Sequence, residues 1–356
     1  MPNRYQLAVV PGDGIGKEVV PIAISVLGAV GELTDNFRFE TTELPWSCEY
    51  YLARGAMMPA DGLGILDAHD AILLGAIGFP SVPDHVSLWG LLLPIRQSFD
   101  QYVNLRPIQV LDGIQSPLTT ATPESVDILC VRENTEGEYA GVGGRIARGQ
   151  PNEIAIQTSV FTRRSIERIA RYAFERARER RGRLASATKS NALQYSAVLW
   201  DEVVAQVGAD YPEVTLTPYH VDALAARFVT QPESLDVVVA SNLFGDILTD
   251  LGGALQGSLG LPAAANLNPE RTHPSMFEPV HGSAPGRAGK GIANPMATVW
   301  ACAMLLDHLG EGEGAALIMD ALRSVARSGP RTPDLGGTAT TVDVGEALRR
   351  EIFARR

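Results

Sequence analysis

The stretch YQLAVVPGDGIGKEVV, residues 5–20, places a short apolar strand directly before a glycine-rich turn and the start of a helix. Glycines at positions 12, 14 and 16 allow the tight turn. A strand, a turn and a helix in this order are typical of α/β folds. The turn does not match the GxGxxG fingerprint of the Rossmann fold, because Lys17 stands where the last glycine is required and no suitable acidic residue ends a second strand. The stretch therefore predicts an α/β fold with a tight turn that enters a helix, without the dinucleotide fingerprint.

Similar apolar, β-branched runs continue along the chain and alternate with helical stretches. They lie at 5–10, 37–44, 71–78, 126–133, 153–161, 183–189, 214–221 and 236–241. The clearest helix is expected at 163–181, where apolar residues recur at helical spacing and Thr162 is a suitable cap. This alternation predicts much parallel strand.

The length of 356 residues suits two domains rather than one. A Gly/Pro-rich segment at 252–295 reads as a long irregular stretch, and such stretches are commonly functional. No single linker separates two halves of the chain, so the domains are expected to be discontinuous in sequence.

Composition excludes several classes of protein. The net charge of −11 disfavours a nucleic-acid partner, because phosphate binding needs clustered basic residues. No apolar run reaches the roughly 18 residues of a membrane span, and the N-terminus shows no export signal. Cys48, Cys130 and Cys302 have no metal-ligand spacing and are expected to be buried, reduced thiols. The sequence thus predicts a cytoplasmic protein with no membrane partner.

Three arginines, Arg96, Arg106 and Arg132, lie within a short span. A planar guanidinium binds carboxylates through paired hydrogen bonds. Arg106 precedes Pro107, which favours an extended or turn backbone, and Arg132 ends a buried-looking strand where an unpaired charge is costly. Each alone is typical of a surface or salt-bridged residue, whereas together they would form an anion site.

Three aspartates are candidate metal ligands. Asp246 and Asp250 are four residues apart, which places them on one face of a helix, and Asp222 follows the predicted strand at 214–221. Three carboxylates suit a hard divalent cation such as Mg²⁺ or Mn²⁺, although such a pair alone is more often a solvated helix face. Lys189 and Tyr139 are candidate proton-transfer groups, since lysine can act as a base and tyrosine as an acid.

Taken together, these segments resemble the β-decarboxylating dehydrogenase family, which includes 3-isopropylmalate, isocitrate, homoisocitrate, D-malate and tartrate dehydrogenases. The resemblance runs nearly from end to end. The motifs that carry it, in the family's order, are PGDGIGKEV, NLRP, VRENTEGEYAG, ATKSNAL, HVDALA, SNLFGDILTDLGG and FEPVHGSAPGRAGKGIANP. So many motifs in one order are far more specific than the glycine turn alone.

The resemblance implies an isopropylmalate dehydrogenase-like α/β fold of two domains, with a central mixed sheet flanked by helices. It implies a large NAD-contacting domain at 1–101 plus 258–356, and a small domain for dimerisation, substrate and metal at 102–257. It also implies a homodimer whose active sites are shared between subunits.

Roles for individual residues follow from the same resemblance. Lys189 and Tyr139 match the catalytic proton-transfer pair, and Arg96, Arg106 and Arg132 match the clamp for the substrate carboxylates. Asp246 and Asp250, with Asp222 from the second subunit, match the ligands of Mg²⁺ or Mn²⁺. Lys189 is also expected from the second subunit. The positions that match the NAD-binding residues are Ile15, Asn191, His281, Gly282, Ser283, Ala284 and Asn294.

The segment 84–107 resembles the D-malate and tartrate dehydrogenase branch most closely. Isocitrate enzymes carry a polar pair where this chain has Gly90 and Leu92, and isopropylmalate enzymes carry an acid where it has Trp89. A small 2-hydroxy dicarboxylate is therefore the expected substrate, with 3-isopropylmalate as the alternative. Leu91 and Pro94 depart from the branch's usual residues and leave an unusual substrate open. The branch also suggests a requirement for K⁺.

One departure concerns the cofactor. NAD-using members of the family usually carry an acid directly after HGSAP, where it accepts the adenosine ribose hydroxyls. This chain has Gly286 there, followed by Arg287, which is suited to the 2′-phosphate of NADP. The Lys-Tyr pair typical of NADP-dependent isocitrate enzymes is absent. NAD is the expected cofactor and NADP the alternative.

Overall fold

The structure, a computed structural model, describes residues 2–355. The chain forms two compact units, and each is built from segments that are distant in sequence. Unit 1 comprises Met1–Gln101, Gln109–Pro123 and Gly253–Arg356, and unit 2 comprises Tyr102–Ile108 and Glu124–Gly252. Within the described residues, every helix is too short or too polar to cross a lipid bilayer.

Unit 1 contains a mixed sheet. Its strands, in spatial order, are β2 (Phe37–Glu43), β1 (Asn3–Gly12), β3 (Ala71–Ala76), β12 (Ser275–Pro279) and β11 (Ala263–Leu267). β1 runs parallel to β2 and β3, and β12 runs parallel to β3, whereas β11 runs antiparallel to β12. Every residue of β3 is buried, as expected for an apolar strand at the centre of a covered sheet.

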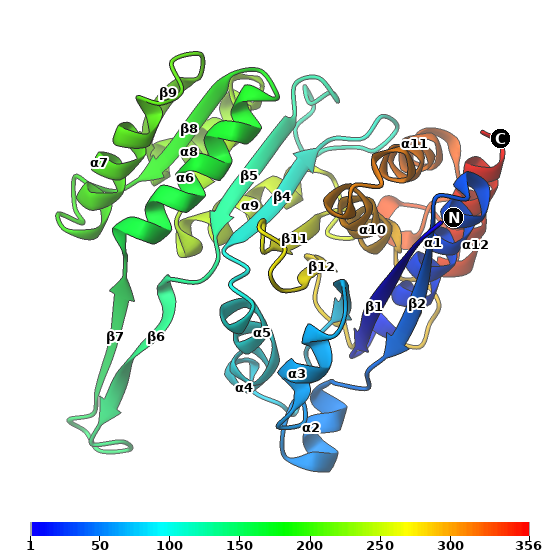
Figure 1. Cartoon of the computed structure of the whole chain (residues 1–356), viewed down its shortest axis with the longest axis horizontal. Helices are drawn as coiled ribbons and strands as arrows, with labels where there is room; N and C mark the ends of the chain where they lie inside the picture. The colour runs from blue at the N-terminus through cyan, green and yellow to red at the C-terminus, as the bar shows by residue number, and fades with distance from the viewer. Residues whose placement is uncertain (1, 356) are drawn as a thin grey trace. The chain divides into compact units, whose positions relative to one another are not determined.

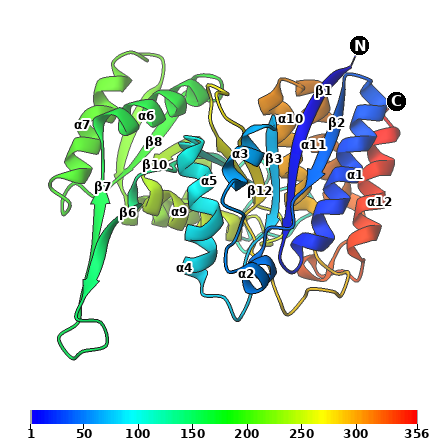
Figure 2. The ribbon, with the colours of Figure 1, turned by 60° about the horizontal axis from the view of Figure 1, so that its bottom comes forward.

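Helices flank this sheet. They are α1 (Gly16–Thr34), α2 (Cys48–Arg54), α3 (Gly62–Asp67), α4 (Asp84–Ser87), a π-helix (Leu88–Leu92), α5 (Leu93–Ser98), α10 (Met296–Leu309), α11 (Gly312–Ser328), a 3₁₀ turn (Pro333–Leu335) and α12 (Thr341–Phe353). α1 and α12 lie side by side, as Figure 2 shows. α10 contacts β3, β11 and β12 and is apolar around most of its circumference, which explains its burial.

Unit 2 carries the second set of strands. In spatial order they are β4 (Val103–Gln109), β5 (Asp127–Glu133), β10 (Val237–Ala240), β8 (Arg183–Thr188) and β9 (Thr215–His220). The pairs β5–β10, β10–β8 and β8–β9 are all parallel. The helices are α6 (Arg163–Arg178), α7 (Ser196–Gly208), α8 (Val221–Thr230), a 3₁₀ turn (Pro232–Ser234) and α9 (Asn242–Leu255). α6 begins as predicted, with the Thr162 hydroxyl accepting a hydrogen bond from the Ser165 N–H.

A two-stranded antiparallel arm, β6 (Gly137–Ile146) and β7 (Ile154–Val160), extends from unit 2 (Figure 1). Its apolar side chains are about half exposed: Val142 48%, Ile146 61%, Ile154 53% and Ile156 54%. Isolated two-stranded ribbons are marginally stable in water.

Unit 2 differs from the expected small domain, 102–257, because residues 109–123 and the segment from Gly253 lie in unit 1. Local contacts explain the difference. Arg327 Nε donates to Asp112 Oδ2 at 2.8 Å, and the Ser116 hydroxyl donates to the Leu255 carbonyl at 2.7 Å. These contacts bind the segment to other parts of unit 1.

The predicted strands are all present, with ends that differ by one or two residues. The prediction of an irregular stretch at 252–295 was wrong in part, because it contains β11 and β12. β11 reads AAANL and lacks the β-branched residues that predict strands; its pairing with β12 makes it a strand. The three cysteines are free and buried, as predicted.

Candidate active site

The glycine turn of unit 1 is fixed by contacts of its backbone. Asp13, which is fully buried, accepts hydrogen bonds from the N–H groups of Cys48 and Gly78 at 2.9 and 3.1 Å. The Ile15 N–H donates to the Ser283 carbonyl at 2.9 Å. Gly14 has φ +54°, and a Cβ there would lie 2.1 Å from the Ser283 carbonyl oxygen. Only glycine fits this close approach.

The segment 281–294 brings together most of the predicted NAD-binding positions. Ser283 and Asn294 are buried, and Gly282 has no neighbouring heavy atom within 4 Å of an added Cβ. Asn294 Nδ2 donates to Asp334 Oδ2 at 3.0 Å. Burial lowers the pKa of His281, so its ring is neutral at pH 7, and its Nε2 has no hydrogen-bond partner among residues 2–355. Unit 1 therefore contains Ile15 and the 281–294 positions, and their role in NAD binding stays a prediction.

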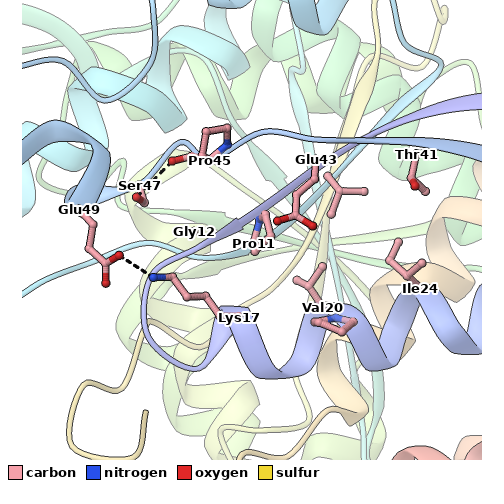
Figure 3. A pocket seen from close by; sticks show the side chains of 12 residues that line it. Pro11, Gly12, Lys17, Val20, Ile24, Thr41, Glu43, Pro45, Ser47 and Glu49 are labelled. Carbon is pink, nitrogen blue, oxygen red and sulfur yellow. Dashed lines mark hydrogen bonds and ion pairs between the residues drawn. The ribbon is translucent and has the colours of Figure 1, made fainter. Parts of the chain in front are cut away.

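A separate cavity of about 570 Å³ lies beside the start of α1 and holds none of the predicted site residues. Figure 3 shows the ion pair of Lys17 with Glu49, 2.6 Å long, at one side of it. The cavity walls also include Val20 and Ile24 of α1 and Glu43 of β2. The candidate site is therefore identified from its charged and polar side chains and not from this cavity.

Arg96 is buried on α5 and pairs with Glu278 Oε1 at 2.8 Å. Asn266 Nδ2 donates to the same Glu278 oxygen at 2.7 Å. The pair is well inside the protein, where breaking it by removing one partner is costly. The sequence predicted Arg96 but did not single out Glu278, although its position in FEPVHGSAP, directly before the predicted NAD-binding positions, was an available signal.

Unit 2 brings Arg106, Arg132, Asp246 and Asp250 together. β10 and β5 are parallel with Ala240 opposite Arg132, and α9 begins at Asn242, two residues after β10 ends. The first turns of α9 therefore lie beside Arg132, where Gly245 gives the Arg132 side chain room to pass, since a Cβ at position 245 would lie 2.5 Å from its Cγ.

The hydrogen bonds of the two arginines orient the aspartates. Arg132 Nη1 donates to Asp246 Oδ1 at 2.5 Å, while its Nε and Nη2 donate to the backbone and side-chain oxygens of Asn242. Arg106 Nη1 donates to the Thr249 hydroxyl at 2.6 Å and lies 3.6 Å from Asp250 Oδ1. The sequence did not single out Asn242 or Thr249, because neither an asparagine at a helix start nor a threonine within a helix indicates chemistry.

Exposure increases from the arginines to the aspartates. The side chain of Arg132 is 3% exposed and that of Arg106 10%, whereas those of Asp246 and Asp250 are 34% and 69% exposed. Loss of hydration raises the pKa of Asp250, assisted by repulsion from Asp246 and opposed by Arg106 and Arg132. Both carboxylates are thus more exposed to solvent than the two positively charged arginines beneath them.

Tyr139 reaches the same place from the arm. Its hydroxyl donates to Asp246 Oδ2 at 3.2 Å, and the Arg132 guanidinium carbon lies 5.7 Å from the ring centroid. The structure therefore places this predicted acid beside one predicted metal ligand.

Lys189 and Asp222 form a second group within unit 2. Lys189 Nζ lies 2.5 Å from Asp222 Oδ1, with Lys189 at the end of β8 and Asp222 in the first turn of α8. The hydrogen bond from Lys189 lowers the pKa of Asp222. Asn191, two residues after Lys189, is exposed.

Within residues 2–355 of one chain, no three acidic, histidine or cysteine side chains come together to bind a metal ion. Asp246 and Asp250 therefore supply two carboxylates, and Asp222 is not the third in the same chain. That Asp222 joins them from a second subunit stays a prediction.

Unit 2 thus combines an arginine-held pair of carboxylates with the Tyr139 phenol beside it. The chain belongs to the isocitrate/isopropylmalate dehydrogenase family, whose model matches residues 6–348. It is a dehydrogenase with the isopropylmalate dehydrogenase-like fold, as the sequence predicted.

Relatives and solved structures cover nearly the whole chain. A probable tartrate dehydrogenase/decarboxylase of Bacillus subtilis is 51% identical over 97% of each chain. A decarboxylating D-malate dehydrogenase of Escherichia coli is 53% identical and covers 99% of this chain and 100% of its own. The crystal structure of isocitrate dehydrogenase from Methylococcus capsulatus superposes with a TM-score of 0.87 at 35% identity, covering 98% of this chain and 99% of that one.

Proposed function

We propose that the protein catalyses the metal-dependent, NAD-linked oxidation and decarboxylation of a small 2-hydroxy dicarboxylate of the D-malate or tartrate type. The observation that carries this proposal is the cluster of unit 2, in which two buried arginines hold Asp246 and Asp250 beside the Tyr139 hydroxyl. Relatives named for tartrate and D-malate support the substrate class.

The donor set fits a hard divalent cation. Asp246 and Asp250 present carboxylate oxygens on one face of α9, and Mg²⁺ and Mn²⁺ prefer such ligands. Asp222 of the partner subunit completes the proposed set. When bound, the cation supplies Lewis acidity at the 2-hydroxyl, and the nicotinamide supplies the hydride acceptor.

The chain's own residues perform the proton transfers and hold the substrate. Lys189 of the partner subunit accepts the proton of the 2-hydroxyl while hydride leaves C2, so that a 2-keto acid forms. The carboxylate β to this ketone is lost as CO₂, and the Tyr139 hydroxyl returns a proton to the carbon that carried it. Arg96, Arg106 and Arg132 orient the substrate carboxylates without taking part in the redox step.

The residues of unit 1 fit a dinucleotide. Ile15, Ser283 and Ala284 meet at the glycine turn, and Gly282 and Gly286 leave open space where side chains would block a ligand. His281 Nε2 is a buried atom without a protein partner among the described residues. Asn294 belongs to the same proposed surface of unit 1, and Asn191 of the partner subunit would lie beside the nicotinamide.

A homodimer is part of the proposal. Unit 2 exposes apolar side chains that a partner would cover, on the arm and at Ile247 of α9, which is 58% exposed. Light scattering after size exclusion tests this: a homodimer is expected, and a stable monomer with full activity would contradict it. The free thiols support a reducing location, and we retain the cytoplasm as the proposed one.

Steady-state kinetics test the substrate. With Mn²⁺ and NAD, kcat/KM is expected to be highest for D-malate or L-tartrate, and lower for 3-isopropylmalate and isocitrate. A preference for isocitrate by orders of magnitude would reject the proposed substrate class, and a preference for 3-isopropylmalate would favour the alternative enzyme. Absence of turnover with the whole panel would reject catalysis.

The same assay decides the cofactor and the cations. Initial rates with NAD are expected to exceed those with NADP; the reverse would assign Arg287 to a 2′-phosphate. Mg²⁺ and Mn²⁺ are each expected to restore activity after chelation with EDTA. A comparison of K⁺ with Na⁺ tests the expected monovalent-cation requirement.

A further inference from the structure

In the loop 284–291 of unit 1, Ala284 and Ala288 pack against neighbouring apolar residues, whereas several other positions are exposed. Added Cβ atoms at Gly286, Gly289 and Gly291 would meet no heavy atom within 4 Å, and Gly289 and Gly291 have positive φ. Ala284 also has a positive φ of 41°. Arg287 and Lys290 are exposed. A glycine-rich loop of this kind has many accessible conformations and requires external contacts to hold one of them.

Three hydrogen bonds from the distant helices α1 and α12 hold the backbone at Gly289, Gly291 and Ala293. The Gly289 N–H donates to Glu18 Oε1 of α1 at 2.7 Å. On the other side, the Thr341 N–H of α12 donates to the Gly291 carbonyl at 2.8 Å, and the Thr341 hydroxyl donates to the Ala293 carbonyl at 2.7 Å. Glu18 contacts the loop through its side chain, whereas Thr341 contacts Gly291 through its backbone, so the Glu18 contact is the one that a substitution can remove.

The surroundings of Glu18 place it between the turn and the loop. Ile15 and Val19, on either side of it in sequence, pack with Ala293, Ala284 and Ala288. The second carboxylate oxygen, Glu18 Oε2, is buried and has no hydrogen-bond partner among residues 2–355. The Glu18 side chain therefore binds the loop through Oε1, and its Oε2 makes no hydrogen bond with the described residues.

We propose that Glu18 is a positioning residue for cofactor binding: its carboxylate fixes the loop 284–291 through the Gly289 N–H and so sets the affinity for NAD. This inference rests on the proposed function, since it uses the proposed NAD-binding positions Ile15 and Ser283–Ala284. Glu18 touches the loop and acts through it on the cofactor.

Glu18 also lies in the first turn of α1, where a negative charge stabilises a helix through its dipole. Two substitutions separate this local role from the proposed one. Glu18→Gln keeps the side-chain length and one acceptor oxygen but removes the charge. The new amide nitrogen can take the place of Oε2, which makes no hydrogen bond with the described residues. Glu18→Asp keeps the charge in the first turn but is one methylene too short to reach the Gly289 N–H.

The two variants are expected to differ in their affinity for the cofactor. Glu18→Asp raises KM for NAD, and the Kd for NADH measured by fluorescence titration, about tenfold, with kcat within about twofold of the parent. Glu18→Gln remains within about threefold of the parent in both constants. If Glu18→Asp does not fold, Glu18→Ala replaces it, because alanine favours the helix and removes the contact.

Limited trypsin digestion tests the loop without any cofactor. Cleavage after Arg287 and Lys290 is expected to accelerate in Glu18→Asp and not in Glu18→Gln. Glu49→Asp and Glu49→Gln serve as matched controls, because Glu49 lies in the first turn of α2 and contacts Lys17 instead of the loop. Neither control should change cleavage or affinity.

Two results would overturn the inference. One is unchanged NADH affinity and cleavage in Glu18→Asp; if the melting temperature changes at the same time, Glu18 only stabilises α1. The other is an equal loss of NADH affinity in Glu18→Gln and Glu18→Asp. Failure of the parent protein to bind NADH or NADPH would instead reject the proposed cofactor, while the trypsin pattern still decides whether Glu18 holds the loop.

Discussion

The two units hold their proposed functional groups in opposite ways. In unit 2, charged side chains hold one another: Arg132 and Arg106 orient Asp246 and Asp250. In unit 1, hydrogen bonds fix the backbone: the Ile15 N–H donates to the Ser283 carbonyl, and the Gly289 N–H donates to the Glu18 carboxylate.

This difference matches the role proposed for each unit. A cation and a reacting carboxylate require fixed charges, which only side chains supply, whereas a dinucleotide lies along open backbone that side chains would obstruct. Substitutions in unit 2 should therefore affect kcat most strongly, and those in unit 1 should act mainly on KM for the cofactor.

The largest effect is expected for Asp246→Asn. This change removes a proposed metal ligand and leaves the buried Arg132 without its anion, so kcat should fall on the order of 10³-fold, and the free energy of unfolding should fall by a few kcal/mol. Kinetics at saturating Mn²⁺ and urea denaturation measure the two. Asp210→Asn, at an exposed pair with Arg171, is the control and should change neither. Retention of kcat within tenfold would contradict the proposed role.

Gly14→Ala is expected to be the next most damaging. The new Cβ would press on the Ser283 carbonyl, and the positive φ would cost a further ~1–3 kcal/mol of stability. KM for NAD should rise at least about tenfold while kcat changes less. Gly28→Ala, on α1 with no neighbour within 4 Å, should be neutral or stabilising. If both changes affect KM equally, the backbone approach does not govern cofactor binding.

A smaller effect is expected at Trp89, which lies in the π-helix and is 42% exposed. If its bulk fills space otherwise used by an isopropyl group, Trp89→Ala should raise kcat/KM for 3-isopropylmalate relative to D-malate about tenfold. Leu52→Ala, at another exposed apolar residue, is the control. An unchanged ratio would remove Trp89 from the specificity determinants.

The smallest effect concerns His308 of unit 1, whose ring is kept neutral by burial. Burial, with help from Arg271, lowers the pKa of His308 to about 4, whereas an unfolded histidine titrates near 6.5. As the pH falls below about 6.5, the unfolded chain binds the proton first, so the free energy of unfolding should decrease by ~1 kcal/mol or more towards pH 4. His308→Gln should weaken this dependence, and His85→Gln, at an exposed residue, should not. Equal pH profiles for the parent and His308→Gln would contradict the exclusion of charge.

Local patterns predicted much of the fold. The β-branched runs gave strands such as β3 and β10, and the spacing of Ile166, Ile169 and Phe174 gave α6. β11 and β12 were missed, since an alanine-rich segment becomes a strand only through its neighbours. The glycine-rich β6 was missed for a similar reason, because its pairing with β7 is not visible in its own composition.

The sequence motifs named residues of the candidate site, whose roles stay predictions, but not the contacts between them. The ordered motifs identified Arg132, Asp246 and Tyr139, and the structure brings these three together. The partners Asn242 and Glu278 were not found, because hydrogen bonds between residues more than 100 positions apart leave no local pattern. Whether Asp222 and Lys189 act across subunits stays a prediction.

The position of β12 between β3 and β11 has a consequence for synthesis on the ribosome. β1, β2 and β3 emerge within the first 76 residues, but β3 has no neighbour on its second side until residues 275–279 have been made. Meanwhile all of unit 2 has emerged and can fold. The nascent chain therefore carries an apolar, unprotected strand edge through most of its translation, and this interval is when we expect chaperones to be needed most.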